Sequence, residues 1–161
     1  MSGLDLTLAT ALIERYKANL SRIRELASAL TEEQFWTKPF SYGNSFGHLV
    51  LHLTGNLNYY IGAQIANTGY VREREREFTN SNRASKEDTL KELDAAVAMV
   101  LETIRSQSST DWGKAYSAVG TSCSNRLDIV IQCAAHMQLH IGQMIYLGTS
   151  GRNRKLCKQL V

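Results

Sequence analysis

The sequence predicts an all-α protein, built as a bundle of four helices. Apolar residues recur at helical spacing in four long segments. The 161 residues include a single proline, and long alternations of β-branched residues are scarce, which argues against a β fold. A hydrophobic content of 43% and a charged content of 20% are typical of a folded soluble protein. We expect residues 1–161 to form one domain, large enough to bury roughly two-thirds of its unfolded surface.

The first helix is expected from Leu4 to about Leu30. Its apolar positions follow one face: Leu8, Leu12, Tyr16, Leu20, Ile23, Ala27 and Leu30. Thr31 with Gln34 three residues later forms a capping-box pattern, which predicts a short helical turn over residues 31–36. Pro39 and Gly43 then interrupt the helical pattern.

The second helix is expected to begin with Asn44 or Ser45 as its N-cap and to run to about Ala66. It contains Gly47, Gly55 and Gly62, each of which weakens a helix by up to ~1 kcal/mol relative to alanine. The close approach of a neighbouring helix would explain their presence. Residues 67–69, Asn-Thr-Gly, end the helix.

Charge alternates in sign along the segment that follows, from Arg72 to Phe78. This pattern is typical of a solvated connection with weak ion pairs, and that is our expectation. The alternative is that its arginines line the entrance for an anionic substrate.

The third helix is predicted to start at Ser85, because acidic side chains at Glu87 and Asp88 complement the helix dipole. Its apolar pattern ends near Gln107. Residues 110–124 are polar and contain two glycines, which predicts an irregular loop with at most a short strand or turn.

The fourth helix is predicted from about Asn125 to Leu147. Residues 148–151, Gly-Thr-Ser-Gly, are expected to end it. A basic tail follows from Arg152, and we expect it to be mobile or to lie on the surface.

The four histidines form two pairs, His48 with His52 and His136 with His140, and each pair is spaced four residues apart on an apolar helix. Residues four apart lie on the same helix face, so the two pairs can point toward one place. Neutral imidazole is a frequent ligand of zinc, nickel, copper and iron, and three such ligands leave a coordination position open. The alternative is that the histidines are hydrogen-bonded core residues.

Several known catalytic motifs are missing around these histidines. Met137 stands where a zincin has its glutamate, and no glutamate precedes a histidine by three residues, as di-iron carboxylate bundles require. No Gly-x-Ser-x-Gly motif is present. A Cys-His-His site with Cys133 is conceivable, but a buried cysteine usually behaves as a small hydrophobic residue.

Composition disfavours several other classes of protein. The net charge of +3 is mild, and the glutamates between the arginines of residues 72–78 oppose binding of nucleic acid. No apolar run approaches the ~20 residues of a membrane span, and no signal peptide is visible. Cys123, Cys133 and Cys157 are an odd number at irregular spacing, which suits free thiols and a cytoplasmic location.

Two motifs resemble those of the DinB/YfiT-like metalloenzyme family. Residues 45–53, SFGHLVLHL, followed by Gly55-Asn56, resemble its second-helix motif. Residues 136–144, HMQLHIGQM, resemble its fourth-helix motif, in which H-x-x-x-H precedes a small residue and glutamine. The segment from Arg72 to Phe78 also resembles an Arg/Asp-rich segment, ending in Glu-Phe, of one branch of this family.

The resemblance implies a DinB-like four-helix bundle that forms a homodimer and holds one divalent metal ion on His52, His136 and His140. Zinc or nickel are the favoured metals, with iron or manganese as alternatives. His48 has no assigned role. It either supports a ligand by a hydrogen bond, is an extra ligand or is simply a helix residue, and we favour the last.

The resemblance also implies a small-molecule substrate. Characterised relatives include metal-dependent transferases and isomerases that use a low-molecular-weight thiol, and proteins described as metal-dependent hydrolases. The sequence leaves open a non-catalytic metal-binding or stress-response protein of the same family, because no general acid or base is evident beside the motifs.

Overall fold

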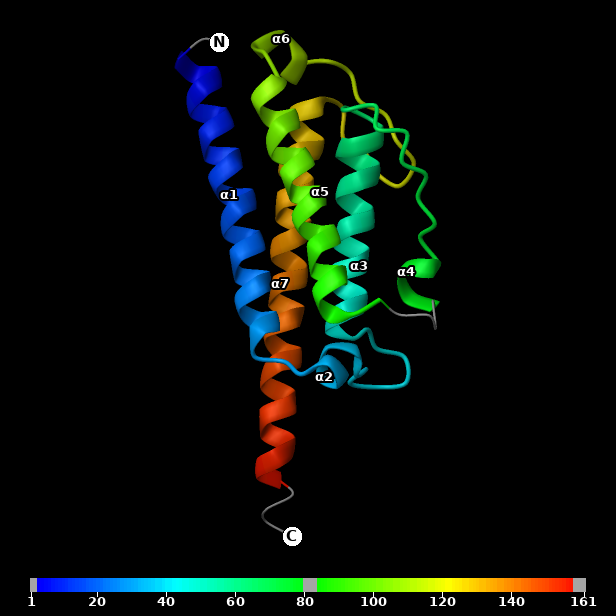
Figure 1. Cartoon of the computed structure of the whole chain (residues 1–161). Helices are drawn as coiled ribbons and strands as arrows, with labels where there is room; N and C mark the ends of the chain where they lie inside the picture. The colour runs from blue at the N-terminus through cyan, green and yellow to red at the C-terminus, as the bar shows by residue number, and fades with distance from the viewer. Residues whose placement is uncertain (1–2, 80–83, 158–161) are drawn as a thin grey trace.

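The computed structural model describes residues 3–79 and 84–157, with side chains, apart from that of Leu4, as far as residue 148. Four long helices dominate this part of the chain and lie side by side (Figure 1). They are α1 (Gly3–Ser28), α3 (Phe46–Leu57), α5 (Lys86–Ser106) and α7 (Arg126–Cys157). A π-helical turn, η1 (Asn58–Ala63), extends α3, and three short helices lie in the connections: α2 (Glu32–Trp36), α4 (Arg76–Thr79) and α6 (Ser109–Trp112). The prediction of an all-α bundle is confirmed.

The chain path makes α3 and α7 antiparallel neighbours. Helices α1 and α7 run in one direction and α3 and α5 in the other, so that the connection carrying α4 has to return along the length of the bundle (Figure 1). Helices α1 and α3 each pack against both α5 and α7. Both predicted histidine-bearing helices therefore share one interface.

All four long helices contribute to one apolar core. Fully buried side chains include Tyr16 of α1, Leu53 of α3, Leu93 of α5 and Met137 of α7. The buried hydroxyl of Tyr16 donates a hydrogen bond to the carbonyl oxygen of Val130 at 2.7 Å, which ties α1 to α7. Burial of these apolar surfaces, at roughly 25 cal/mol per Å², supplies most of the driving force for assembly.

The predicted helix starts agree with the structure. The capping box of Thr31 and Gln34 is present, with both reciprocal hydrogen bonds formed. Ser45 is the N-cap of α3, and Ser85 is the N-cap of α5, where its hydroxyl accepts from the amide of Asp88. Side-chain oxygens at these positions satisfy amide groups that have no partner inside the helix.

The structure differs from the prediction within the second helix and at the end of the fourth helix. The second helix is α-helical only to Leu57 and then widens into η1. Just past the end of η1, the amide of Ala66 bonds to the carbonyl of Ile61 five residues earlier at 3.0 Å. The fourth helix does not end at residues 148–151 but continues to Cys157, past the end of the bundle at α2 (Figure 1). A glycine costs a helix only about 1 kcal/mol, which an established long helix tolerates. The predicted basic tail is thus helical as far as Cys157, and residues 158–161 lie outside the described residues.

The three glycines of the second helical segment mark close approaches, as the sequence suggested. A Cβ atom on Gly47 would lie 2.5 Å from the indole of Trp36 in α2. One on Gly62 would lie 3.1 Å from the Met99 side chain of α5. One on Gly55 would collide with the carboxylate of Glu77 in α4. Glycine here lets other segments pack directly against the helix backbone.

No helix within residues 3–79 and 84–157 combines the length and the apolar character that crossing a bilayer demands.

Replacing Gly47 by alanine should destabilise the protein by about 1–3 kcal/mol, because the added methyl group overlaps the indole of Trp36. Gly142→Ala is the matched control, since an added Cβ in α7 would meet no atom within 4 Å and should stabilise the helix by up to ~1 kcal/mol. Denaturant unfolding followed by circular dichroism measures both changes. Equal stability of the two variants would contradict the packing described for Gly47.

Candidate metal centre

The structure brings three of the four histidines to one point. His52 comes from α3, and His136 and His140 lie one turn apart on α7. The Nε2 atom of His136 lies 3.0 Å from Nε2 of His52 and 3.1 Å from Nε2 of His140. All three ring nitrogens lie within 4.8 Å of one another, so that this group has the proximity that a shared metal ion requires.

The cluster is largely withdrawn from solvent. His52 and His140 are 7% and 9% exposed, and His136 is half-buried. Burial, reinforced by the neighbouring imidazoles, lowers the pKa of His136 to about 4. Burial and the proximity of His52 also lower the pKa of His140, against the opposing hydrogen bond to Gln143. His136 and His140 are therefore uncharged at neutral pH, with lone pairs available for coordination.

Hydrogen bonds at the far side of two rings assign their tautomers. The Nδ1 atom of His52 lies 2.9 Å from the Glu77 carboxylate, and Nδ1 of His140 lies 2.7 Å from the Gln143 carbonyl oxygen. Both oxygens are acceptors, so each Nδ1 carries the proton and each Nε2 presents its lone pair to the cluster. This pattern of outer partners is the usual one for metal-binding histidines.

The donor set fits a divalent metal ion. Three nitrogens at zinc's usual 2.0–2.1 Å in tetrahedral geometry would be roughly 3.3 Å apart, close to the spacing of the Nε2 pairs given above. Without a cation, the Nε2 lone pairs of His52 and His140 both face Nε2 of His136. A neutral His136 carries at most one proton on that atom, so it cannot donate a full hydrogen bond to both lone pairs. An all-imidazole set favours zinc, nickel, copper or iron over magnesium or calcium.

Arg72 and Glu77 form a buried ion pair behind His52. The Nε and Nη2 atoms of Arg72 donate to the two carboxylate oxygens of Glu77 at 2.7 and 3.0 Å. Arg72 Nη2 also lies 3.3 Å from Nδ1 of His52, but both atoms are donors, so Glu77 is the acceptor that they share. Burial by itself would raise the pKa of Glu77, but hydrogen bonds from His52 and Arg72 and the charge of Arg72 outweigh it and lower that pKa.

The expectation of a solvated connection is therefore wrong for these two residues. The side chains of Arg72 and Glu77 are only 10% and 8% exposed. The neighbouring pair of Arg76 and Glu73, at 74% and 56% exposed, does match it. The segment folds back on α3 because Gly55 leaves room for the Glu77 carboxylate.

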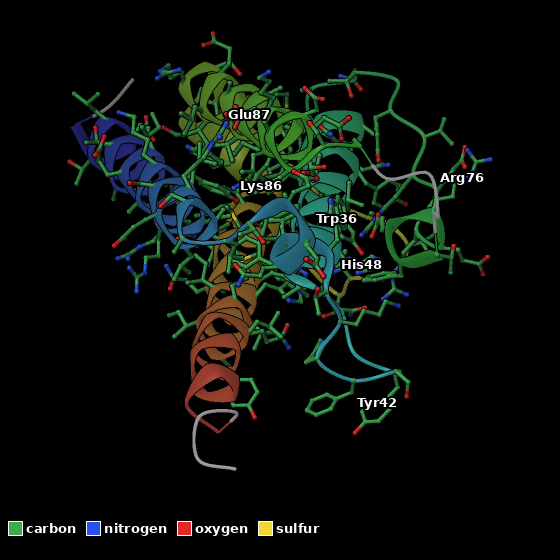
Figure 2. All side chains as sticks on the ribbon, turned by 60° about the horizontal axis from the view of Figure 1, so that its bottom comes forward. Trp36, Tyr42, His48, Arg76, Lys86 and Glu87 are labelled. Carbon is green, nitrogen blue, oxygen red and sulfur yellow. The ribbon has the colours of Figure 1, made fainter. Side chains whose placement is uncertain are left out.

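His48 lies outside the cluster and is engaged at the start of α3. Its Nδ1 accepts a hydrogen bond from the Ser45 amide at 3.2 Å and lies 2.7 Å from the Ser45 hydroxyl. Its ring meets the edge of Trp36 with centroids 5.7 Å apart, and Figure 2 shows both side chains at the α2 end of the bundle. The two histidines of the first pair thus occupy different environments.

Cys133 lines a pocket beside the centre but does not belong to the three-residue cluster. It is 2% exposed, and burial raises the pKa of its thiol to about 12. The side chain is therefore a neutral thiol at physiological pH. This agrees with the prediction that Cys133 behaves as a small hydrophobic residue.

Sequence reasoning named Gln143 and Glu77 within family motifs but did not predict that they are hydrogen-bond partners of the histidines. Gln143 follows His140 by three residues, and that spacing on a helix was a usable signal. Glu77 is 25 residues from His52 and belongs to a different helix. In the sequence it differs from Glu73 and Glu75 only by its place before Phe78, and its contact with His52 is visible only in the tertiary structure.

The fold and the site together define a four-helix bundle with a buried three-histidine group. The family model of the DinB superfamily matches residues 15–144, and the chain belongs to that superfamily. The crystal structure of a conserved protein from Enterococcus faecalis is similar in fold, with a TM-score of 0.71 at 17% identity, and the match covers 86% of this chain and 94% of that one. No curated protein matches the sequence significantly.

Replacing Glu77 by glutamine should destabilise the metal-free protein by on the order of 3 kcal/mol, because the buried Arg72 loses its counter-charge. Glu73→Gln is the matched control: its ion pair is exposed, and its loss should cost less than about 1 kcal/mol. Urea unfolding in the presence of a chelator measures both. If Glu77→Gln were as stable as Glu73→Gln, the buried pair would not have the importance assigned to it.

Proposed function

We propose that the protein is a metal-dependent enzyme that binds one divalent ion, zinc or nickel, on His52, His136 and His140. The convergence of three Nε2 atoms, with two tautomers fixed by Glu77 and Gln143, carries this proposal. We propose a transferase or isomerase that uses a low-molecular-weight thiol. Membership of the DinB superfamily and the open pocket beside the histidines support it.

The metal, when bound, would supply a positive charge that favours the deprotonated, nucleophilic form of a thiol ligand. The chain's own residues prepare the site for this role. Glu77 and Gln143 hold the His52 and His140 rings in orientation, which limits the ordering that binding has to impose. Burial raises the pKa of Cys133 and leaves this neighbouring thiol protonated, which is consistent with a reacting thiol supplied by a cosubstrate.

Metal analysis of the purified protein tests the site. Wild type should contain close to one transition-metal ion per chain, and His52→Gln and His136→Ala should lose it, because two imidazoles hold an ion far more weakly than three. His48→Gln is the matched control on the same helix and should retain the metal. Equal metal content in His52→Gln and His48→Gln would refute the proposed three-histidine site.

The same variants test the reaction. The metal-loaded protein, offered low-molecular-weight thiols and an electrophilic substrate, should form the conjugate, and His52→Gln should not. A metal-loaded wild type that conjugates no thiol would favour a metal-binding protein without turnover.

We further propose a homodimer, as the family membership suggests. Helix α7 exposes Ile131, Ala135 and Leu139 at intervals of four residues, with Leu139 60% exposed. Such an apolar stripe suits a contact between two copies of the chain.

Replacing Leu139 by glutamate should shift the protein from dimer to monomer in sedimentation velocity, because the contact would bury a charge. Leu6→Glu on α1 is the control, since Leu6 is equally exposed, at 59%, and lies on another helix. A wild type that sediments as a monomer would refute the dimer.

A further inference from the structure

A pocket of about 710 Å³ opens beside the histidine cluster and is large enough for a small-molecule ligand. His52 and His136 both line it, so one side of the proposed metal centre faces the pocket. The pocket is walled by α3 with η1, by residues 70–72 and Arg74, by Val119 and Gly120, and by α7. The described residues that line it include no aspartate or glutamate, so the pocket itself offers no negative charge to an incoming ligand.

Asn56 has a buried side-chain oxygen without a hydrogen-bond donor in the part of the chain that the structure describes. It follows His52 by one helical turn on α3, lines the same pocket and is only 7% exposed. Its Oδ1 atom is buried and has no hydrogen-bond partner among the described residues. Two other buried side-chain atoms there share this condition, on Thr89 and Trp112, but neither residue lines the pocket. A buried acceptor without a donor costs about 1–3 kcal/mol, so a ligand with a suitable N–H or O–H group would relieve that cost.

Arg74 brings a positive charge to the same pocket. Arg72 is neutralised by Glu77, and Arg76 pairs with Glu73, whereas Arg74 has no ion pair within the described ranges 3–79 and 84–157. Its charge reaches Tyr60 across the pocket: burial raises the pKa of that tyrosine, and Arg72 and Arg74 oppose the rise. An exposed, unpaired guanidinium at the rim of a pocket without carboxylates favours an anionic ligand.

We infer that this pocket recognises an anionic small molecule through two groups: an N–H or O–H donor near its metal-binding atom, accepted by Asn56, and a carboxylate or similar anion paired with Arg74. The inference rests on the proposed metal site and adds the class of ligand to it. Asn56 lies one helical turn from His52, so it would contact the ligand group next to the ligand atom that binds the metal. Arg74, at the exposed end, selects the distant charge.

Three thiols that differ in one group each test the inference on the cobalt(II)-loaded protein. N-acetylcysteine carries a thiol, an amide N–H and a carboxylate; its methyl ester lacks the charge; and 3-mercaptopropionate lacks the amide. The thiolate-to-cobalt absorption band gives a Kd for each without any turnover. Wild type should bind N-acetylcysteine most tightly of the three.

Each variant should affect only the probes that carry the matching group. Arg74→Gln should weaken N-acetylcysteine about fivefold and leave the methyl ester unchanged. Asn56→Leu should weaken N-acetylcysteine and its ester about tenfold and leave 3-mercaptopropionate unchanged. Arg76→Gln, in the same segment but paired with Glu73, is the control and should bind all three as wild type does. Asn56→Ala, which also lacks an acceptor, replaces Asn56→Leu if the leucine variant fails to fold by circular dichroism.

The outcomes separate this inference from the metal site. If cobalt binds and Arg74→Gln and Asn56→Leu bind all three thiols as wild type does, the inference is overturned and the metal site stands. The same holds if cobalt binds but no thiol gives the absorption band. If cobalt does not bind, and wild type is indistinguishable from His136→Ala, the metal site and the inference fall together.

Discussion

One buried ion pair holds the site together. The carboxylate of Glu77 accepts from Arg72 and from His52 at the same time, and it lies against the bare backbone of Gly55. Through it, the connection between α3 and α5 is pinned to the bundle at the level of the histidines. The orientation of the His52 ring, the wall of the pocket formed by residues 70–72 and the position of Arg74 at its rim all depend on this contact. An ion pair withdrawn from water is costly unless its hydrogen-bonding capacity is used, and here both carboxylate oxygens are occupied.

The second requirement of the site is that its imidazoles stay neutral. Crowding three rings together in a buried place disfavours protonation, and this is why the pKa of His136 falls so far. A cation on the three Nε2 atoms would relieve the repulsion between facing lone pairs. Burial keeps His136 and His140 uncharged, as metal binding at this site would require.

Much of the fold could be predicted from the sequence, because helical periodicity and caps such as Ser45 and Ser85 are local signals. The three clustered histidines could also be predicted, from their spacing and from the family resemblance. Glu77 could not, because its role depends on a chain reversal that brings residues 25 positions apart into contact. The length of α7 was underestimated since glycine weakens a helix without always ending it. The π-helical turn had no recognisable signal in the sequence.

That π-helical turn separates two parts of one helix. In a regular α-helix, every residue added or removed rotates all later side chains by about 100°. A wider turn takes up one extra residue locally, so the positions before Leu57 and those after Asn58 keep independent registers. His52 and Asn56 lie before the turn, whereas Tyr59 and Tyr60 lie within it and line the same pocket. The turn thus lies between the part of the helix that carries His52 and Asn56 and the part that carries Tyr59 and Tyr60, so the two parts line one pocket in separate helical registers.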